Sequence, residues 1–399
     1  MAHMSQIMVP LDLTYSRAQP AAADVVIIGG GVMGMSVAWQ LARQGVRNIV
    51  VVEQSTLGSG SSAKPLGGIR ANFSDPGNVV LGKRSLEAYH RFSREFGVDI
   101  ELSRVGYLFL ARTDEEMDDL HSSAVTQAAL GIETRVLTPE QAVEVNPYLN
   151  AAALKGASFT PDDGHAAPAK VVEGYARACL ALGVTILDRT QVLDIQRSAD
   201  SISAVITQRG EIRTGAVICA AGAWSAGIGS MVGVELPVEP VRRMIGLTRQ
   251  MPAPHPTVPF TLDLSTTMYF HNFYNGLLVG ISHLEKSEFC REYSYEWLRE
   301  FNAAASVCAP VLENPDLEAG WAGYYENTPD HNALIGESCE LPGFYYLTGF
   351  SGHGFLQAPA AGELLADIFL GRESFMDPRP FSVERFAGVG SCLREVNII

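Results

Sequence analysis

Long apolar runs are absent from this sequence. No segment approaches the roughly 20 consecutive apolar residues that a membrane-spanning helix needs, so the sequence does not predict an integral membrane protein. The first residues also lack the apolar centre of a secretory signal peptide. We therefore leave residues 1–23 outside the fold and expect them to form a flexible N-terminal segment.

Cysteine is sparse, and its six positions are scattered. They form no C-x-x-C pair and show no metal-ligand spacing, and a chain of 399 residues does not need a disulfide framework. These absences predict no metal site and a location in the reducing cytoplasm.

Charged residues are few, and most of them are acidic. They make up 18% of the chain, against an average of about 25% in globular proteins, while 47% of the residues are hydrophobic. This composition excludes extensive disorder. With 29 Lys and Arg against 44 Asp and Glu, the formal charge is −15. Such a surface repels phosphate backbones and anionic lipids, so we expect neither nucleic acid nor a membrane surface as a partner.

Motifs of nucleophilic, zinc-dependent and nucleoside-triphosphate chemistry are also missing: there is no G-x-S-x-G, H-E-x-x-H or P-loop. The chain has instead a βαβ pattern over residues 24–53, with the turn Gly29-x-Gly31-x-x-Gly34 after an apolar run. The first glycine permits the tight turn, the second lets a pyrophosphate approach the backbone, and the third lets helix and strand pack closely. This pattern predicts dinucleotide binding.

An acidic residue, Glu53, ends the second strand of this unit, 19 residues after Gly34. Its carboxylate can accept the ribose hydroxyls and disfavours a 2′-phosphate. NADP is therefore not expected, and FAD and NAD remain.

The rest of the chain alternates between helical and strand-like segments. We predict helices over residues 76–96, 114–130, 170–182, 293–304 and 355–370, and short strands between them. The middle of the chain is richer in strands. The fold class is therefore α/β, with a Rossmann-like nucleotide-binding layer and a second layer on a mixed or antiparallel sheet.

Three motifs together resemble the D-amino-acid oxidase superfamily of FAD enzymes, and within it the group of the sarcosine oxidase and L-proline dehydrogenase β-subunits. They are DVVIIGGGVMG from Asp24, WAGYYENTPDHNALIG from Trp321 and GFYYLTGFSGHGFLQAPAAGELLADIFLG from Gly343. The resemblance implies an FAD-binding domain built from residues 24–104, 160–236 and 322–399, and a substrate-binding domain built from residues 105–159 and 237–321.

The cofactor implied by the resemblance is FAD. Glycines before the last helix let backbone approach a flat ring, and the N-terminus of that helix would stabilise negative charge on the reduced flavin. The residues that we expect at FAD are Gly29, Gly31, Val32, Met33, Gly34, Glu53, Gln54, Ser61, Ser62, Gly67, Gly68, Ala221, Gly222, Trp224, Gly352, His353, Gly354, Phe355 and Leu356.

Three positions depart from the pattern of these relatives. Gly323 stands where some of them attach FAD to a cysteine, so we expect FAD to be bound non-covalently. Leu278 stands where a lysine promotes reaction with oxygen, which favours a dehydrogenase over an oxidase. Leu356 stands where a lysine holds the substrate carboxylate; Arg70 is retained, and help from Arg242 or Arg243 is left open.

The resemblance implies catalytic or substrate-contacting roles for His353, Tyr269 and Arg70, and a weaker one for Tyr324. His165 lies near the position at which the sarcosine oxidase β-subunit carries covalent FMN, although a histidine in a turn explains it equally well. The expected reaction is hydride transfer from the carbon next to an amine to flavin N5, followed by hydrolysis of the imine. Secondary or N-methylated amino acids, proline-like or sarcosine-like, come first among the expected substrates.

Other functions remain open from the sequence. They are the oxidation of a D-amino acid or glycine, a flavin monooxygenase, and a non-catalytic FAD-bound assembly protein. A dehydrogenase would also need a redox partner subunit or another electron acceptor.

Overall fold

The computed structural model describes residues 13, 18–62, 64, 66–198, 200–249, 255–282, 289–290, 292–388 and 395–396. Part of the predicted flexible segment, residues 1–12 and 14–17, lies outside the described residues. The end of that segment is held to the protein: Ala23 N–H donates to the carbonyl of Arg213 at 2.9 Å, and Arg213 N–H donates to that of Ala21 at 3.0 Å.

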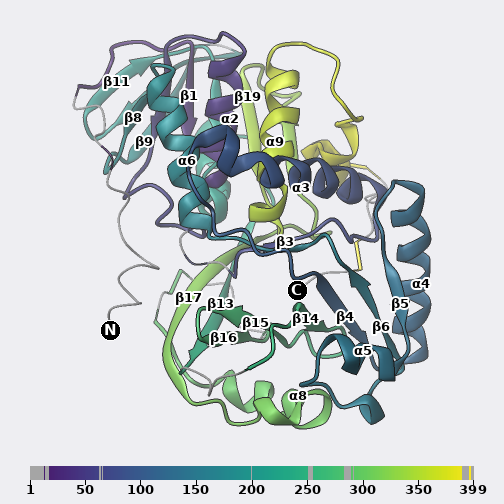
Figure 1. Ribbon diagram of the computed structural model, residues 1–399. Helices are drawn as coiled ribbons and strands as arrows, with labels where there is room; N and C mark the ends of the chain where they lie inside the picture. Colours follow the sequence, from purple (N-terminus) through teal and green to yellow (C-terminus); the bar gives the residue numbers. More distant parts are fainter. Residues whose placement is uncertain are drawn as a thin grey trace.

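Two large sheets organise the molecule (Figure 1). The first has six strands in the order β18-β19-β12-β1-β2-β8. Its strands are β1 (Val25–Ile28), β2 (Ile49–Val52), β8 (Thr185–Leu187), β12 (Val217–Cys219), β18 (Leu334–Glu337) and β19 (Phe344–Thr348). All neighbours are parallel except β18 and β19. The four residues of β1 are all buried, as expected of a parallel sheet covered on both faces.

The second sheet has eight strands in the order β17-β13-β16-β15-β14-β4-β6-β5. Its strands are β4 (Tyr107–Ala111), β5 (Arg135–Leu137), β6 (Gly156–Thr160), β13 (Glu239–Thr248), β14 (Phe260–Asp263), β15 (Tyr269–Phe273), β16 (Gly276–Gly280) and β17 (Leu317–Asn327). Its pairs are antiparallel except β4 with β14. The structure thus has the mixed α/β architecture that the sequence predicts. The division into domains by residue ranges stays a prediction, and β17 crosses its boundary at residue 321.

Smaller sheets complete the strands of the described residues. They are β9 (Val192–Ser198), β10 (Ser201–Thr207) and β11 (Gly210–Arg213) in one sheet, and β3 (Gly68–Ile69) with β7 (Gly164–His165) in the other. The pair β3–β7 lies between the two large sheets (Figure 1).

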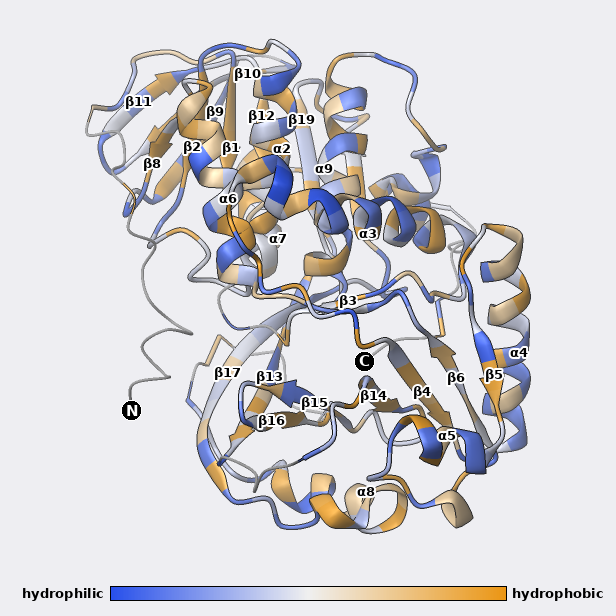
Figure 2. Ribbon diagram, viewed as in Figure 1, coloured by the Kyte–Doolittle hydropathy of each residue, from blue (hydrophilic) through white to orange (hydrophobic). Residues whose placement is uncertain are grey.

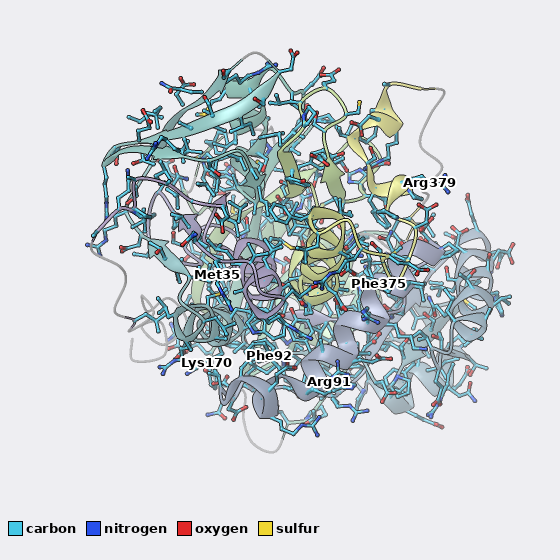
Figure 3. The ribbon with its side chains drawn as sticks, turned by 90° about the horizontal axis from the view of Figure 1, so that it is seen from above. Met35, Arg91, Phe92, Lys170, Phe375 and Arg379 are labelled. Carbon is cyan, nitrogen blue, oxygen red and sulfur yellow. The ribbon has the colours of Figure 1, made fainter. Side chains whose placement is uncertain are left out.

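Helices cover the sheets on the outside. They are α2 (Val32–Arg43), α3 (Pro76–Phe96), α4 (Asp114–Ala129), α5 (Pro139–Val145), α6 (Pro168–Ala181), α7 (Ser225–Val232), α8 (Leu298–Cys308) and α9 (Gly354–Phe369). Figure 2 shows hydrophobic strands inside and many hydrophilic residues on α3 and α4. In α3, for example, Arg91 is exposed and the next residue, Phe92, is fully buried (Figure 3).

The predicted helix boundaries are accurate for α3 and differ by up to two residues for α4, α6 and α9. The helix predicted to begin at residue 293 begins at Leu298. The rings of Tyr293 and Tyr295 contact each other instead, with centroids 5.2 Å apart. Within the described residues, no helix is long and apolar enough to span a membrane.

Candidate functional site

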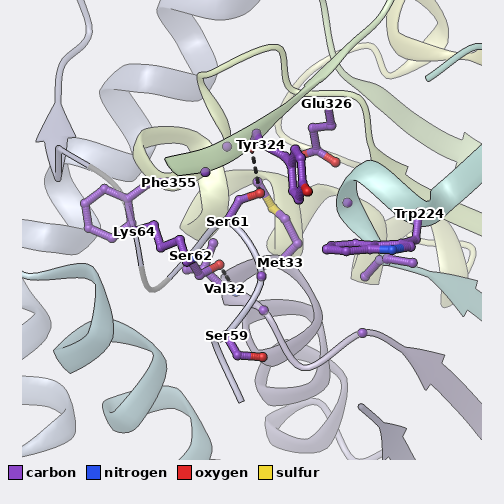
Figure 4. A pocket seen from close by; sticks show the side chains of 18 of the residues that line it. Val32, Met33, Ser59, Ser61, Ser62, Lys64, Trp224, Tyr324, Glu326 and Phe355 are labelled. Carbon is purple, nitrogen blue, oxygen red and sulfur yellow. Dashed lines mark hydrogen bonds between the residues drawn. The ribbon is translucent and has the colours of Figure 1, made fainter. Parts of the chain in front are cut away.

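A cavity of about 680 Å³ connects the two large sheets. At one end it begins at the carboxyl ends of β1 and β12, where residues 28, 29, 31–33 and 220–222 line it. At the other end it reaches side chains of β4, β13 and β15 in the eight-stranded sheet. Figure 4 shows the part of its wall that includes Met33, Trp224 and Glu326. The carboxyl ends of parallel strands are where open α/β sheets bind their ligands.

The glycine turn after β1 has the close approaches that its fingerprint requires. Gly29 has φ +116°, and a Cβ there would lie 2.2 Å from the carbonyl oxygen of Ala220. A Cβ at Gly34 would lie 1.9 Å from the carbonyl oxygen of Gly29. Gly34 is therefore a packing residue beneath the turn and does not line the cavity, whereas Gly29 and Gly31 do.

The N-terminus of α2 faces this cavity with little capping. Gly31, at the N-cap, has no side chain to accept a hydrogen bond, and Ser62 Oγ accepts one from Val32 N–H at 2.9 Å. The positive end of the helix dipole therefore remains available to a pyrophosphate. Glu53, at the end of β2, is held in the wall by Gly30 N–H and Ser55 N–H, each at 2.8 Å from its carboxylate.

Most of the predicted cofactor residues are brought together here. The cavity wall contains Gly29, Gly31, Val32, Met33, Glu53, Gln54, Ser61, Ser62, Gly67, Gly68, Ala221, Gly222, Trp224, Gly352, Gly354, Phe355 and Leu356. The wall suits a dinucleotide because glycines keep side chains out of it: a Cβ at Gly31 would lie 3.2 Å from Ser62 Oγ, and Gly222 has a φ of +56°, which favours glycine.

Arg70 and His353, two of the predicted catalytic residues, lie behind the wall and do not line it. Their side chains meet, with Arg70 Nη2 3.2 Å from His353 Nε2, and the two residues are 1% and 3% exposed. The Arg70 guanidinium also lies over the ring of Phe73, 4.1 Å from its centre, and donates to Asn72 Oδ1 at 3.2 Å. Burial, helped by the charge of Arg70, holds the pKa of His353 well below its usual range. A neutral His353 can accept a hydrogen bond from Arg70.

The third, Tyr269, lines the far end of the cavity together with residues that the sequence analysis did not name. Tyr107 stacks on Phe260, with ring centres 4.3 Å apart and planes 9° from parallel. Tyr325 joins them from β17. Burial raises the pKa of Tyr269 and of Tyr325 above the usual range, so both stay neutral hydroxyl groups.

Of the two arginines left open by the sequence, Arg243 lines the cavity. Its guanidinium lies 5.1 Å from the centre of the Tyr325 ring. Arg242, the preceding residue on β13, points the other way because side chains alternate along a strand. Its Nη1 donates to the carbonyl oxygen of Glu292 at 3.0 Å. The alternation of side chains along a strand predicts that Arg242 and Arg243 point in opposite directions. It does not predict which of the two faces the cavity.

The three positions that depart from the relatives' pattern lie in the cavity wall or directly behind it. Gly323 lines the cavity and offers no side chain for covalent attachment. Leu278 does not line the cavity: it is 1% exposed and packs behind the wall with Ile245, Leu247 and Trp321, so it brings no charge there. His165 does not line the cavity, and its ring lies 4.5 Å from that of His271. The role of His165 in FMN attachment stays a prediction.

Comparison with known proteins adds the following. The family described as FAD dependent oxidoreductase (DAO) matches residues 24–368. Glycine oxidase of Geobacillus kaustophilus is 32% identical over 373 residues, covering 92% of this chain and 97% of that protein. Sarcosine oxidase subunit beta of an Arthrobacter species is 27% identical and covers 91% of each chain. The crystal structure of L-proline dehydrogenase from P. horikoshii superposes with a TM-score of 0.87 at 33% identity, covering 92% of this chain and 99% of that one.

Proposed function

This chain belongs to the family of FAD dependent oxidoreductases, and from that membership we propose that it oxidises the carbon–nitrogen bond of a small secondary or N-methylated amino acid. Relatives named for glycine, sarcosine and L-proline share nearly the whole length of the chain. The observation that carries the proposal is Arg243 in the cavity wall, next to three tyrosines.

The cofactor is FAD, which supplies the hydride acceptor when it is bound. The residues that would hold it are the glycine turn at residues 29–31, Glu53 and the N-termini of α2 and α9. No nucleophile is required of the protein, because the flavin carries the difficult step. The protein orients the substrate and excludes water.

Arg243 is suited to hold a substrate carboxylate. A guanidinium can bind a carboxylate with two parallel hydrogen bonds, and burial without such a cation would be costly. Tyr107, Tyr269 and Tyr325 provide aromatic surface and neutral hydroxyl groups around it. These groups can donate to a carboxylate or accept from an amine without adding charge.

Arg70 and His353 are then positioning residues for this site. Their mutual contact and their packing on Phe73 fix the turn that leads into α9. That turn carries Gly352 and Gly354 in the cavity wall. A cytoplasmic location and non-covalent FAD remain part of the proposal.

The test is anaerobic mixing of the purified holoenzyme with sarcosine, L-proline, D-proline, glycine and D-alanine in turn, with the visible flavin band followed over time. Bleaching by sarcosine or a proline supports the proposal and names the substrate. Bleaching by glycine or D-alanine alone would replace it by primary amino-acid oxidation, and a flavin that none of the five reduces would contradict it.

We further propose that the enzyme is a dehydrogenase that passes electrons to a partner. Leu278, which packs behind the cavity wall on Ile245 and Trp321, supplies no cation there, and one relative is named as a subunit of an oxidase. Air admitted after bleaching should restore the flavin band slowly, while an artificial acceptor dye should restore it quickly. Fast recovery in air alone would make the protein an oxidase.

A further inference from the structure

Glu326, a second acidic side chain in the wall of the FAD cavity, has no role in the fingerprint or in the proposed substrate site. Among the described residues that line the cavity, the acidic ones are Glu53 and Glu326. Glu53 binds two backbone N–H groups near the glycine turn, as a ribose-binding acid does. Glu326 lies elsewhere, near the end of β17, beside Tyr324 (Figure 4).

The carboxyl group of Glu326 is held at the carboxyl end of β19. Thr348 Oγ1 donates a hydrogen bond to Glu326 Oε2 at 2.9 Å, and the N–H groups of Gly349 and Phe350 also donate to the carboxyl group. Gly222 and Gly354 bring two further elements close to it: a Cβ at Gly354 would lie 3.7 Å from Oε1. The carboxyl group therefore lies beside the glycines that shape the cofactor cavity.

The surroundings of Glu326 disfavour its negative charge. Burial raises the pKa of this carboxyl to about 7, although the three hydrogen bonds lower it in part. No lysine or arginine is among the groups that lower it. Part of the side chain remains exposed in the cavity, where FAD would lie.

Within the described part of the chain, the cationic side chains that line the same cavity are those of Lys64 and Arg243. The other groups around Glu326 stay neutral near pH 7. On β12, burial raises the pKa of the Cys219 thiol to about 11. At the start of α9, the pKa of His353 is far below its usual range, and on β17 the pKa of Tyr325 is raised. Glu326 is thus the member of this group whose charge changes near neutral pH.

We propose that Glu326 is a cofactor-binding residue that holds a proton while FAD is bound. The pyrophosphate of FAD carries negative charge into a cavity of low dielectric, where an ionised carboxylate in the same wall would repel it. A protonated carboxyl removes this repulsion. It keeps an oxygen to accept from Thr348 and can donate its proton to an acceptor of FAD. This inference depends on FAD binding and not on the identity of the substrate.

The proposal predicts how the affinity for FAD changes with pH. FAD adds negative charge to the cavity that Glu326 lines and so raises the pKa of the carboxyl further, which means that binding takes up a proton. By linkage, the affinity for FAD falls as the pH rises above about 7, by at most about tenfold per pH unit for one proton. Below that pH the carboxyl is protonated in both states and the affinity is constant.

The experiment is serial dilution of the purified holoenzyme between pH 6 and pH 8.5, with the fluorescence of released FAD giving the Kd at each pH. Three proteins are compared: wild type, Glu326→Gln, which is neutral at every pH, and Glu318→Gln, an exposed position on the same strand. We expect the Kd of wild type and of Glu318→Gln to rise by about tenfold or more across this range. The Kd of Glu326→Gln should stay within about threefold of its value at pH 6.

Two results would overturn the proposal: a wild-type Kd that does not change with pH, or a Glu326→Gln variant that keeps the wild-type slope. If Glu326→Gln fails to fold with FAD, Glu326→Asp decides the question, because it retains a titratable carboxyl. A pH-dependent Kd in Glu326→Asp supports the proposal, and a constant Kd refutes it. Failure of the amino-acid panel above would leave this measurement unaffected.

Discussion

At the scale of single residues, the site depends on which of two neighbouring arginines faces inward. Arg243 lies in the cavity wall and Arg242 bonds to the carbonyl oxygen of Glu292, although the two are adjacent on β13. Arg70, which the sequence favoured as the carboxylate-binding cation, is enclosed by His353, Asn72 and Phe73. Of these three arginines, Arg243 is therefore the one whose side chain can reach a substrate in the cavity.

The first prediction concerns this pair. Arg243→Gln should raise the KM for the reducing amino acid by about 10- to 100-fold, because a hydrogen bond to a charged group contributes about 1.5–3 kcal/mol. Arg242→Gln is the matched control and should leave KM within about twofold, since it removes a charge of the same sign one residue away. Steady-state kinetics with an acceptor dye measures both. An unchanged KM in Arg243→Gln would move carboxylate binding away from this residue.

The second prediction concerns reaction with oxygen. Leu278→Lys places a cation directly behind the cavity wall, where Leu278 packs on Ile245 and Trp321. Because a fixed positive charge stabilises developing negative charge in a site of low dielectric, we expect reoxidation of the reduced flavin by air to accelerate about tenfold or more. Leu278→Met keeps the volume without the charge and should behave as wild type. Equal reoxidation rates in the two variants would show that this position does not control oxygen reactivity.

At the scale of secondary-structure elements, two helices far apart in the sequence support the cofactor turn. Helix α2 begins at the glycine fingerprint and α9 begins beside the cavity, and the two pack against each other. At their contact, a Cβ on Gly362 would lie 2.3 Å from Ser36 Oγ. Ser36 Oγ donates to the carbonyl oxygen of Ala358 at 2.8 Å.

The third prediction tests this contact. Gly362→Ala should lower the free energy of unfolding by about 1–3 kcal/mol, because the added methyl group overpacks the buried interface. Ser36→Gly in the same chain should recover part of the loss by removing the side chain that the methyl meets. Thermal unfolding of the four proteins of this double-mutant cycle gives the coupling. Additive effects would mean that the two helices do not meet as described.

The elements also show what sequence periodicity can predict. Helix α3 has the ends that the sequence predicts: Asp75 caps it, Pro76 opens it and Gly97 ends it with a left-handed φ of 66°. Helix α8 begins five residues later than predicted, at Leu298, because Tyr293 and Tyr295 contact each other in the loop before it. Short helices such as α7 carry too few residues for a periodic signal.

At the scale of the whole molecule, the cofactor cavity lies between the two large sheets, and residues from both sheets line it. The fingerprint and Glu53 were readable from the sequence, because their spacing is local. The residues at the far end of the cavity could not be predicted in this way. They come from four strands whose order the sequence does not specify: Tyr107, Arg243, Tyr269 and Tyr325. Tyr269 was named only through resemblance, and Arg243 only as one of two alternatives.

The fourth prediction follows from a cavity of about 680 Å³ between the sheets. Removal of FAD should lower the Tm, because a ligand that binds the folded state stabilises it by about 4 kcal/mol at 1,000 times its Kd. Thermal unfolding before and after removal, followed by titration with FAD, measures the effect. The Tm should return with increasing FAD concentration, and a Tm that is the same with and without FAD would contradict this role of the cavity.

The order of the six-stranded sheet has a consequence for biosynthesis. β1 and β2 leave the ribosome first, yet β12, the neighbour of β1 on its other side, ends at residue 219, and β19 follows only at residues 344–348. Until α9 emerges, the nascent chain exposes the buried face of α2. We therefore expect flavin insertion to follow translation of α9, and nascent chains that stall before Gly354 to be handled by chaperones and proteases.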